Sequence, residues 1–149
     1  AVMGLSGLQN YRFGRSVTIP FPENGSISET PYGVIAENKS RNLHTLCFLD
    51  IKAEEQKYMT VSEALESLLA LEKKNRLHIV TAENLAVGVA RAGAANVTVK
   101  AEMVKNLMGF DFGGPPHALV VPSDKLHFME AEALIIHAHA PEWVRRMIQ

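Results

Sequence analysis

Six histidines and one cysteine are the side chains of this sequence that most readily ligate a metal ion or act as a base or nucleophile. The histidines are His44, His78, His117, His127, His137 and His139. The closest pair, His137-x-His139, falls at the end of an expected helix, where residues two apart point to nearly opposite faces. Paired metal ligands on a helix stand three or four residues apart. The spacing therefore predicts no metal site.

Patterns for a nucleophile or a phosphate-binding loop are also missing. Cys47 lies within the apolar run 46–49, where a thiol usually behaves as an inert small hydrophobic group. No Gly-x-Ser-x-Gly elbow occurs. The pair Gly113 and Gly114 lacks the lysine and the strand-loop-helix order of a phosphate loop. Residue types alone therefore leave the catalytic residues unknown.

Composition narrows the class of protein. The sequence has 149 residues, 47% of them hydrophobic, which suits one domain with a sizeable core. Its 15 basic and 16 acidic residues give a net charge of -1, so no overall field favours nucleic acid or an anionic membrane. Apolar runs such as 118–121 fall far short of the roughly 20 residues of a membrane-spanning helix. Because one cysteine cannot close an intrachain disulfide, we expect a reducing, cytoplasmic compartment.

The apolar pattern predicts strands alternating with helices. Strands are expected at residues 16–20, 44–51, 85–91, 97–99 and 117–121. Helices are expected near residues 1–11 and at 31–42, 61–75, 101–107 and 126–137. A run that is apolar almost throughout, such as 44–51, suits a strand buried on both faces. The alternation is typical of an α/β fold in which helices cover a mixed sheet.

Local signals sharpen some of these boundaries. Thr60 and Glu63 form a capping-box pattern before the third helix. Thr30 is the expected N-cap of the second helix, with Pro31 at its first position. The charged stretch 52–57 and the stretch 109–116 are expected loops. Apolar stripes are expected on the third helix at Val61, Ala64, Leu65, Leu68 and Leu69, and on the last at Phe128, Ala131, Leu134, Ile135 and Ala138.

The expected sheet offers two candidate binding points. In open α/β sheets, ligands bind beyond the carboxyl ends of the strands. Here those ends are Leu49-Asp50 and Arg91-Ala92-Gly93. Main-chain groups exposed there can hydrogen-bond a planar heterocycle, while Leu49 and Ala92 give apolar contact to its face.

Several blocks of the sequence resemble the diphthine synthase family in order and spacing. They are Gly7-Leu8-Gln9-x-Tyr11-x-Phe13-Gly14, the His-Thr-Leu-x-x-Leu-Asp-Ile-Lys block at 44–52, Tyr58-Met59-Thr60, Ala90-Arg91-Ala92-Gly93 and the stretch 111–117 ending in Pro-Pro-His. The family comprises S-adenosylmethionine-dependent methyltransferases of diphthamide biosynthesis and is similar to the tetrapyrrole methylases. The resemblance implies two α/β domains with the cofactor between them, of which residues 1–149 form the carboxyl-terminal domain.

The resemblance also implies which parts of the site this chain holds. It assigns Leu49, Ala92 and His117 to the adenosyl pocket. We expect His117, which opens a buried strand, to make its contact through the main chain, because main-chain donors and acceptors suit the neutral edge of adenine. The amino-terminal features of the family, a glycine-rich strand end, a Gly-Asp-Pro loop and a Ser-Ile pair, have no counterpart here. The chain also opens at Ala1 without an initiator methionine. We therefore expect a fragment of a longer protein that is inactive alone.

The activity implied by the resemblance is methylation of the amine on the modified histidine of translation elongation factor 2, which leaves S-adenosylhomocysteine as product. The resemblance implies no metal and assigns no general base. It also implies a homodimer, which a group of apolar residues near one loop favours as well. These residues are Met103, Leu107, Met108, Phe110 and Phe112.

Two other functions stay open at the level of sequence. A tetrapyrrole-methylase-like small-molecule methyltransferase would share the fold, although the blocks quoted above are closer to the protein-modifying family. A non-catalytic binding or dimerisation module would explain why nothing in this chain performs chemistry unaided.

Overall fold

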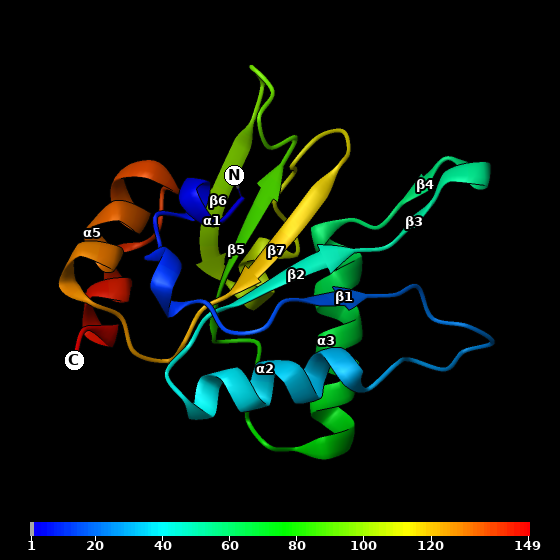
Figure 1. The fold of residues 1–149 in the computed structure, drawn as a ribbon, viewed down its shortest axis with the longest axis horizontal. Helices are drawn as coiled ribbons and strands as arrows, with labels where there is room; N and C mark the ends of the chain where they lie inside the picture. The colour runs from blue at the N-terminus through cyan, green and yellow to red at the C-terminus, as the bar shows by residue number, and fades with distance from the viewer. Residues whose placement is uncertain (1) are drawn as a thin grey trace.

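The computed structural model describes residues 2–149 and is built around a five-stranded sheet with helices on both faces (Figure 1). In spatial order the strands are β1 (Val17–Ile19), β2 (Thr45–Leu49), β7 (His117–Val121), β5 (Leu85–Ala90) and β6 (Thr98–Met103). The β1–β2 pair is parallel and the other three pairs are antiparallel. The mixed sheet predicted from the sequence is confirmed.

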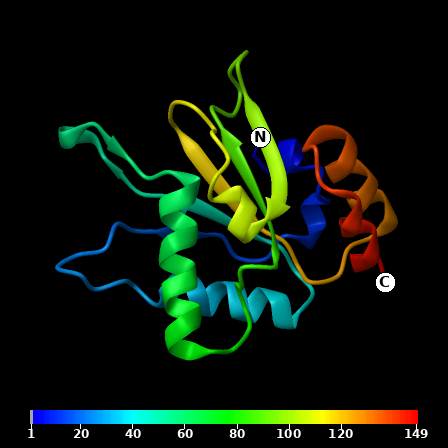
Figure 2. The same cartoon turned by 180° about the vertical axis from the view of Figure 1, so that it is seen from behind.

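Helices cover the two faces of the sheet unequally. They are α1 (Val2–Ser6), α2 (Thr30–Ser40), α3 (Val61–Asn75), α4 (Val104–Leu107) and α5 (Phe128–His137), with short 3-10 helices at Asn10–Arg12, Ala53–Glu55 and Glu142–Met147. The residues of α2, α3 and α4 pack into the core on one face. Those of α1, α5 and the last 3-10 helix pack on the other (Figures 1 and 2).

Strand β5 forms the centre of both cores. All six of its residues are buried, and they alternate between the two faces, with Ala86 and Ala90 on one and Leu85 and Val87 on the other. A side chain at Gly88 would collide with the ring of Phe112, so the glycine lets the loop before β7 lie directly against the sheet. The strand predicted here is confirmed.

Helix α3 begins and ends where its local signals predict. The Thr60 hydroxyl accepts a hydrogen bond from the Glu63 main-chain N–H at 3.1 Å, and the Glu63 carboxylate accepts one from the Thr60 N–H at 3.0 Å. This capping box satisfies two donors that a helix start leaves unpaired. Except for half-buried Leu69, the predicted apolar stripe is buried.

A buried carboxylate, Glu130 of α5, joins segments that are far apart in sequence. It accepts hydrogen bonds from Arg12 at 2.5 Å, from His44 at 2.7 Å and from the main-chain N–H groups of Gln9 and His127, both at 3.0 Å. Burial raises the pKa of Glu130, but the hydrogen bonds from His44 and the two N–H groups outweigh it and lower the pKa to about 2. Glu130 is therefore ionised at neutral pH.

The expected helix at 101–107 is wrong in its first three residues. Residues 101–103 continue β6, and the helix, α4, covers Val104–Leu107. The reason is long-range pairing: β6 is in register with the whole of β5, from Leu85 opposite Met103 to Ala90 opposite Thr98. The ladder hydrogen bonds and the burial of Ala101 outweigh the local helix propensity of this stretch.

The start of α2 and the stretch 52–57 also differ from expectation. Helix α2 has Glu29 rather than Thr30 as its N-cap, because the Glu29 carbonyl already accepts from the Gly33 N–H at 3.2 Å. The charged stretch is a small hairpin of β3 (Ile51–Lys52) and β4 (Lys57–Tyr58). Gln56, in the left-handed conformation with φ 50°, reverses the chain there.

Two aromatic residues are less buried than predicted. Phe48 is 49% exposed, so β2 is not covered on both faces at its carboxyl end. Phe128 is 64% exposed and begins α5, because Leu126 is held outside the helix by a bridge to Ile148.

No helix within residues 2–149 has both the length and the apolar character needed to cross a membrane.

We expect Glu130→Gln to destabilise the fold by about 3–5 kcal/mol at pH 7, because it leaves Arg12 buried without its counter-charge. The pKa of Glu130 is lowered on folding, so its contribution is present above its ordinary value of 4.5 and is lost as the pH falls through about 2. Urea unfolding of the wild type and of Glu130→Gln between pH 7 and pH 2 measures this contribution. The difference between their free energies of unfolding should become smaller as the pH falls.

The control is Glu132→Gln, two residues along the same helix, whose carboxylate pairs with Arg145 near the surface. It should change stability little. Equal stabilities of wild type and Glu130→Gln at pH 7, or a gap that does not narrow below pH 4.5, would contradict this account of Glu130.

Candidate functional site

The sheet topology brings the candidate residues to one edge. Strands β2 and β5 are both antiparallel to β7, so they are parallel to each other and end where β7 begins. Phe48 pairs with Ala118, so Leu49 follows beside the start of β7. On the other side Ala90 pairs with His117, and Ala92 follows two residues later. Leu49, Ala92 and His117 therefore flank the same end of three neighbouring strands.

The three residues differ in what they expose at this edge. Leu49 is only 8% exposed and packs in the core on the α3 face, which leaves mainly its main chain for a ligand. Ala92 is exposed in the turn that follows β5. His117, the first residue of β7, is half-buried. Of the three, Ala92 offers the most accessible side chain.

The imidazole of His117 is fully engaged by the protein. Its Nδ1 lies 3.2 Å from the main-chain nitrogen of Val61, and its Nε2 lies 3.0 Å from the carbonyl oxygen of Gly113. A main-chain N–H only donates, so Nδ1 accepts and Nε2 carries the proton that is donated to Gly113. Val61 is the first residue of α3, and its N–H has no partner inside the helix. The side chain of His117 thus caps α3 and holds the loop before β7.

An open hollow of about 230 Å³ lies beside His117. Its other walls come from the loop before β7 and from the chain that leaves the β3–β4 hairpin, through Gly113, Pro115, Gln56, Tyr58, Met59 and Thr60. Complete ligand sites usually enclose about 300–1,000 Å³. The hollow is smaller than a complete ligand site and is open to the surroundings, so it can form one wall of such a site.

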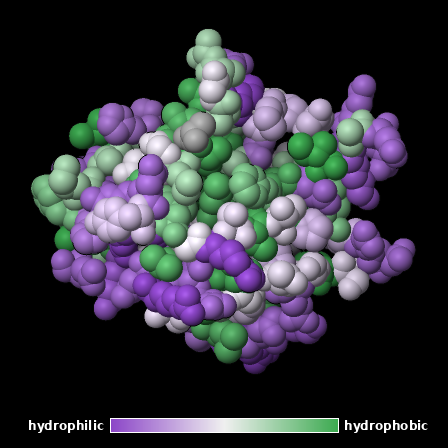
Figure 3. Space-filling view, in the orientation of Figure 1, coloured by the Kyte–Doolittle hydropathy of each residue, from purple (hydrophilic) through white to green (hydrophobic). Residues whose placement is uncertain are grey.

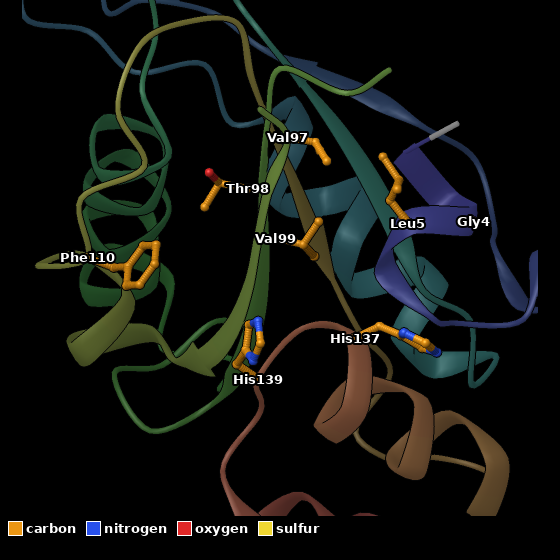
Figure 4. A pocket seen from close by; sticks show the side chains of 8 residues that line it. All are labelled: Gly4, Leu5, Val97, Thr98, Val99, Phe110, His137 and His139. Carbon is orange, nitrogen blue, oxygen red and sulfur yellow. The ribbon is translucent and has the colours of Figure 1, made fainter. Parts of the chain in front are cut away.

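A larger hollow, of about 640 Å³, lies between α1 and β6 (Figure 4). Its lining residues are Gly4, Leu5, Val97, Thr98, Val99, Phe110, His137 and His139. His139 lies beyond the end of α5 with φ 52°, so the helix-spacing argument does not apply to it. The two imidazoles point apart in Figure 4. Within residues 2–149, no group of three or more His, Cys, Asp or Glu side chains is placed to hold a metal ion.

Other candidate groups are enclosed in the core. Burial raises the pKa of the Cys47 thiol to about 12, so it is not a nucleophile at neutral pH.

The apolar group near residues 103–112, expected to be exposed, is mostly buried. Leu107 and Phe112 are 1% and 4% exposed, and within this group only Phe110 reaches 38%. Phe112 is buried because its ring packs onto Gly88, and Leu107 is buried because α4 packs into the core on the α3 face. That group gives no support to a dimer.

Sequence reasoning missed the role of Arg91. Its side chain reaches from the turn after β5 to the loop before β7, where it hydrogen-bonds main-chain carbonyls. The left-handed backbone of Arg91, with φ 55°, turns the chain at this point. An arginine followed by Ala92-Gly93 gives no local signal for such a contact, because its acceptors lie about 20 residues further along the chain.

Comparison with known proteins gives one consistent group of relatives, although no family model matches the chain. The chain is 54% identical over 134 residues to diphthine synthase of Methanocella arvoryzae, a match that covers 90% of the chain and 51% of that protein. It is 51% identical over 154 residues to diphthine synthase of Methanosarcina mazei, covering 100% and 57%. The chain therefore spans about half the length of the curated relatives it matches.

Solved structures give the same result for the fold. A crystal structure of diphthine synthase matches with a TM-score of 0.85 and 41% identity over 99% of this chain and 53% of that one. A putative diphthine synthase from Entamoeba histolytica matches with a TM-score of 0.87 and 34% identity, over 94% and 56%. The predicted α/β, tetrapyrrole-methylase-like fold is confirmed. In sequence and in fold, this chain is a homologue of diphthine synthases over about half of their length.

Proposed function

We propose that this chain is the carboxyl-terminal α/β domain of an S-adenosylmethionine-dependent methyltransferase of diphthamide biosynthesis and supplies one wall of its cofactor site. The observation that carries the proposal is the meeting of Leu49, Ala92 and His117 at one edge of the sheet. Of the three, His117 also lines an open hollow of about 230 Å³. Ligands of open α/β sheets bind at such strand ends. The similarity to diphthine synthases names the reaction class.

The residues at this edge fit an adenosyl group. Ala92 and the neighbouring Gly93 keep the turn free of large side chains, and no atom lies within 4 Å of where a Cβ of Gly93 would stand. The Ala92 methyl can lie against the face of a purine ring, while main-chain donors and acceptors near Leu49 and His117 bind its neutral edge. Bound there, S-adenosylmethionine supplies an electrophilic methyl group.

For this chemistry the protein chiefly aligns an unprotonated amine with the methyl group and excludes water. His117 is not the general base, because its Nδ1 accepts from Val61 and its Nε2 donates to Gly113. The acceptor we propose is the amine on the modified histidine of translation elongation factor 2. We place the enzyme in the cytoplasm with that factor as its protein partner, and we assign it no role in binding nucleic acid or membrane.

The sheet offers a surface for a second α/β domain. Phe48, Ala118, Val89 and Val99 are neighbours in register across four strands, on the face that α1 and α5 only partly cover. Val89 is buried, and Ala118 and Val99 are half-buried. Phe48 is 49% exposed, and Figure 3 shows apolar residues at the surface over β5 and β7. These residues lie at the same end of the strands as the candidate site, on the face of the sheet opposite the His117 imidazole.

The isolated chain should not methylate elongation factor 2, because it holds only one wall of the cofactor site. A chimera that joins residues 1–149 to the unmatched half of Methanocella arvoryzae diphthine synthase should do so, since the two matched halves are 54% identical. Mass spectrometry of elongation factor 2 after incubation with S-adenosylmethionine measures the added methyl groups. Turnover by the pure chain would refute the half-site proposal, and an inactive but folded chimera would count against the assigned reaction.

Replacing Ala92 by leucine should weaken binding of S-adenosylhomocysteine to the chimera by about tenfold to a hundredfold. The larger side chain overfills the space of the ring, which typically costs about 1–3 kcal/mol. Thermal unfolding of the ligand-free protein should change little, because Ala92 is exposed. Calorimetric titration gives the affinities. Ala95→Leu, in the same exposed turn, is the control and should bind normally; unchanged binding by Ala92→Leu would remove this turn from the site.

We also propose a homodimer that forms through the outer face of α5. Phe128, Met129 and Ile136 are 64%, 70% and 65% exposed and lie on one side of this helix. Exposed apolar groups of this kind mark interaction surfaces. Met129→Glu should shift the mass measured by light scattering from dimer to monomer at micromolar concentration. Leu77→Glu, at an exposed leucine outside α5, should leave a dimer; a monomeric wild type would rule the proposal out.

A further inference from the structure

The side chain of Arg91 donates all of its hydrogen bonds to other groups of the protein. Its Nη1 donates to the carbonyl oxygen of Phe112 at 2.8 Å and to that of Gly114. Its Nε and Nη2 donate to the carbonyl oxygen of Asn96 at 3.2 and 3.1 Å, and Nη2 also donates to the Thr98 hydroxyl at 3.0 Å. A guanidinium has five N–H donors, and these contacts use five. None is left for a ligand.

These bonds join two segments that carry the candidate site. The turn 91–97 contains Ala92, and the loop 109–116 leads into His117; both lie at the same end of the sheet in Figures 1 and 2. The main-chain N–H of Arg91 donates to the carbonyl oxygen of Pro116 at 2.7 Å. His117 adds a bond to Gly113. Four of the last five loop residues therefore have a carbonyl oxygen that accepts a hydrogen bond from Arg91 or His117, namely Phe112, Gly113, Gly114 and Pro116.

We propose that Arg91 is a positioning residue, which clamps the loop 109–116 to the turn 91–97 and so holds the wall of the cofactor pocket in its binding geometry before the cofactor arrives. This inference rests on the proposed function. The loop has no helix or strand of its own, and its ordering would otherwise cost conformational entropy on every binding event. Because its donors are all used within the protein, Arg91 acts through the loop and does not contact the reacting atoms.

The planar fork of the guanidinium is what the clamp requires. Its acceptors lie on both sides of the side chain, in the loop 109–116 and in the turn and strand at Asn96 and Thr98. Lysine offers one point charge with three donors on a flexible stem and does not span these acceptors at once. Arg91→Lys should therefore behave like Arg91→Ala, whereas a role that depends on positive charge alone would be preserved by lysine.

Hydrogen exchange and ligand binding together test the clamp. In the wild-type chimera, exchange of amides in the loop 109–116 should be the same with and without S-adenosylhomocysteine, since the loop is ordered in advance. In Arg91→Ala and Arg91→Lys it should be at least about tenfold faster without ligand, and slow when ligand is added. Affinity for S-adenosylhomocysteine should fall by about tenfold to a hundredfold. Exchange in the middle of α3 should be unchanged, which separates loss of positioning from loss of fold.

Arg76→Ala is the matched control. Arg76 is also an arginine in the left-handed conformation, with φ 57°, but it lies exposed at the end of α3, and its side chain makes one long hydrogen bond, to the Lys73 carbonyl. It should leave both loop exchange and affinity unchanged. Affinity within twofold of wild type in Arg91→Ala, or unchanged loop exchange, would overturn the clamp while the proposed function stands. Failure of the wild-type chimera to bind S-adenosylhomocysteine would instead overturn the proposed function itself.

Discussion

Antiparallel hydrogen bonding of β7 to both β2 and β5 is the constraint on which the candidate site depends. Two strands that share an antiparallel neighbour run parallel to each other, so β2 and β5 end together at the edge where β7 begins. Segments separated by about 40 residues of sequence thereby present Leu49 and Ala92 on either side of His117. Had β7 paired in the parallel sense with either strand, these residues would lie at opposite edges of the sheet.

Two neutral histidines hold the two ends of β7. At its start, His117 bonds α3 through Val61 and the preceding loop through Gly113. Just past its end, the N–H of Ser123 donates to Nδ1 of His44, whose Nε2 donates to buried Glu130. One histidine therefore links β7 to the candidate site, and the other links it to the charged cluster that fixes α5.

The features that the sequence predicted well are those with local causes. The capping box of Thr60 and Glu63 and the apolar runs of β5 and β7 are read within a few residues, and the strand ends follow from them. The features it missed depend on distant partners. Arg12 and Glu130 are 118 positions apart, and the length of β6 is set by its register with β5. The Phe112 and Gly114 carbonyls that accept from Arg91 belong to another loop. Leu49 and Ala92 could be named from strand ends alone, whereas the use of the His117 side chain depended on the position of α3.

The most direct test of the central claim is a nuclear magnetic resonance titration of the ¹⁵N-labelled 149-residue chain with S-adenosylhomocysteine. The isolated chain should bind weakly, and the amide shifts that change should cluster at residues 49–50, 91–93 and 113–117, where β2 and β5 end and β7 begins. Shifts that cluster instead around Val97–Val99 and His137, at the larger hollow beside α1, or no shifts at the strand ends even at millimolar ligand, would contradict the account.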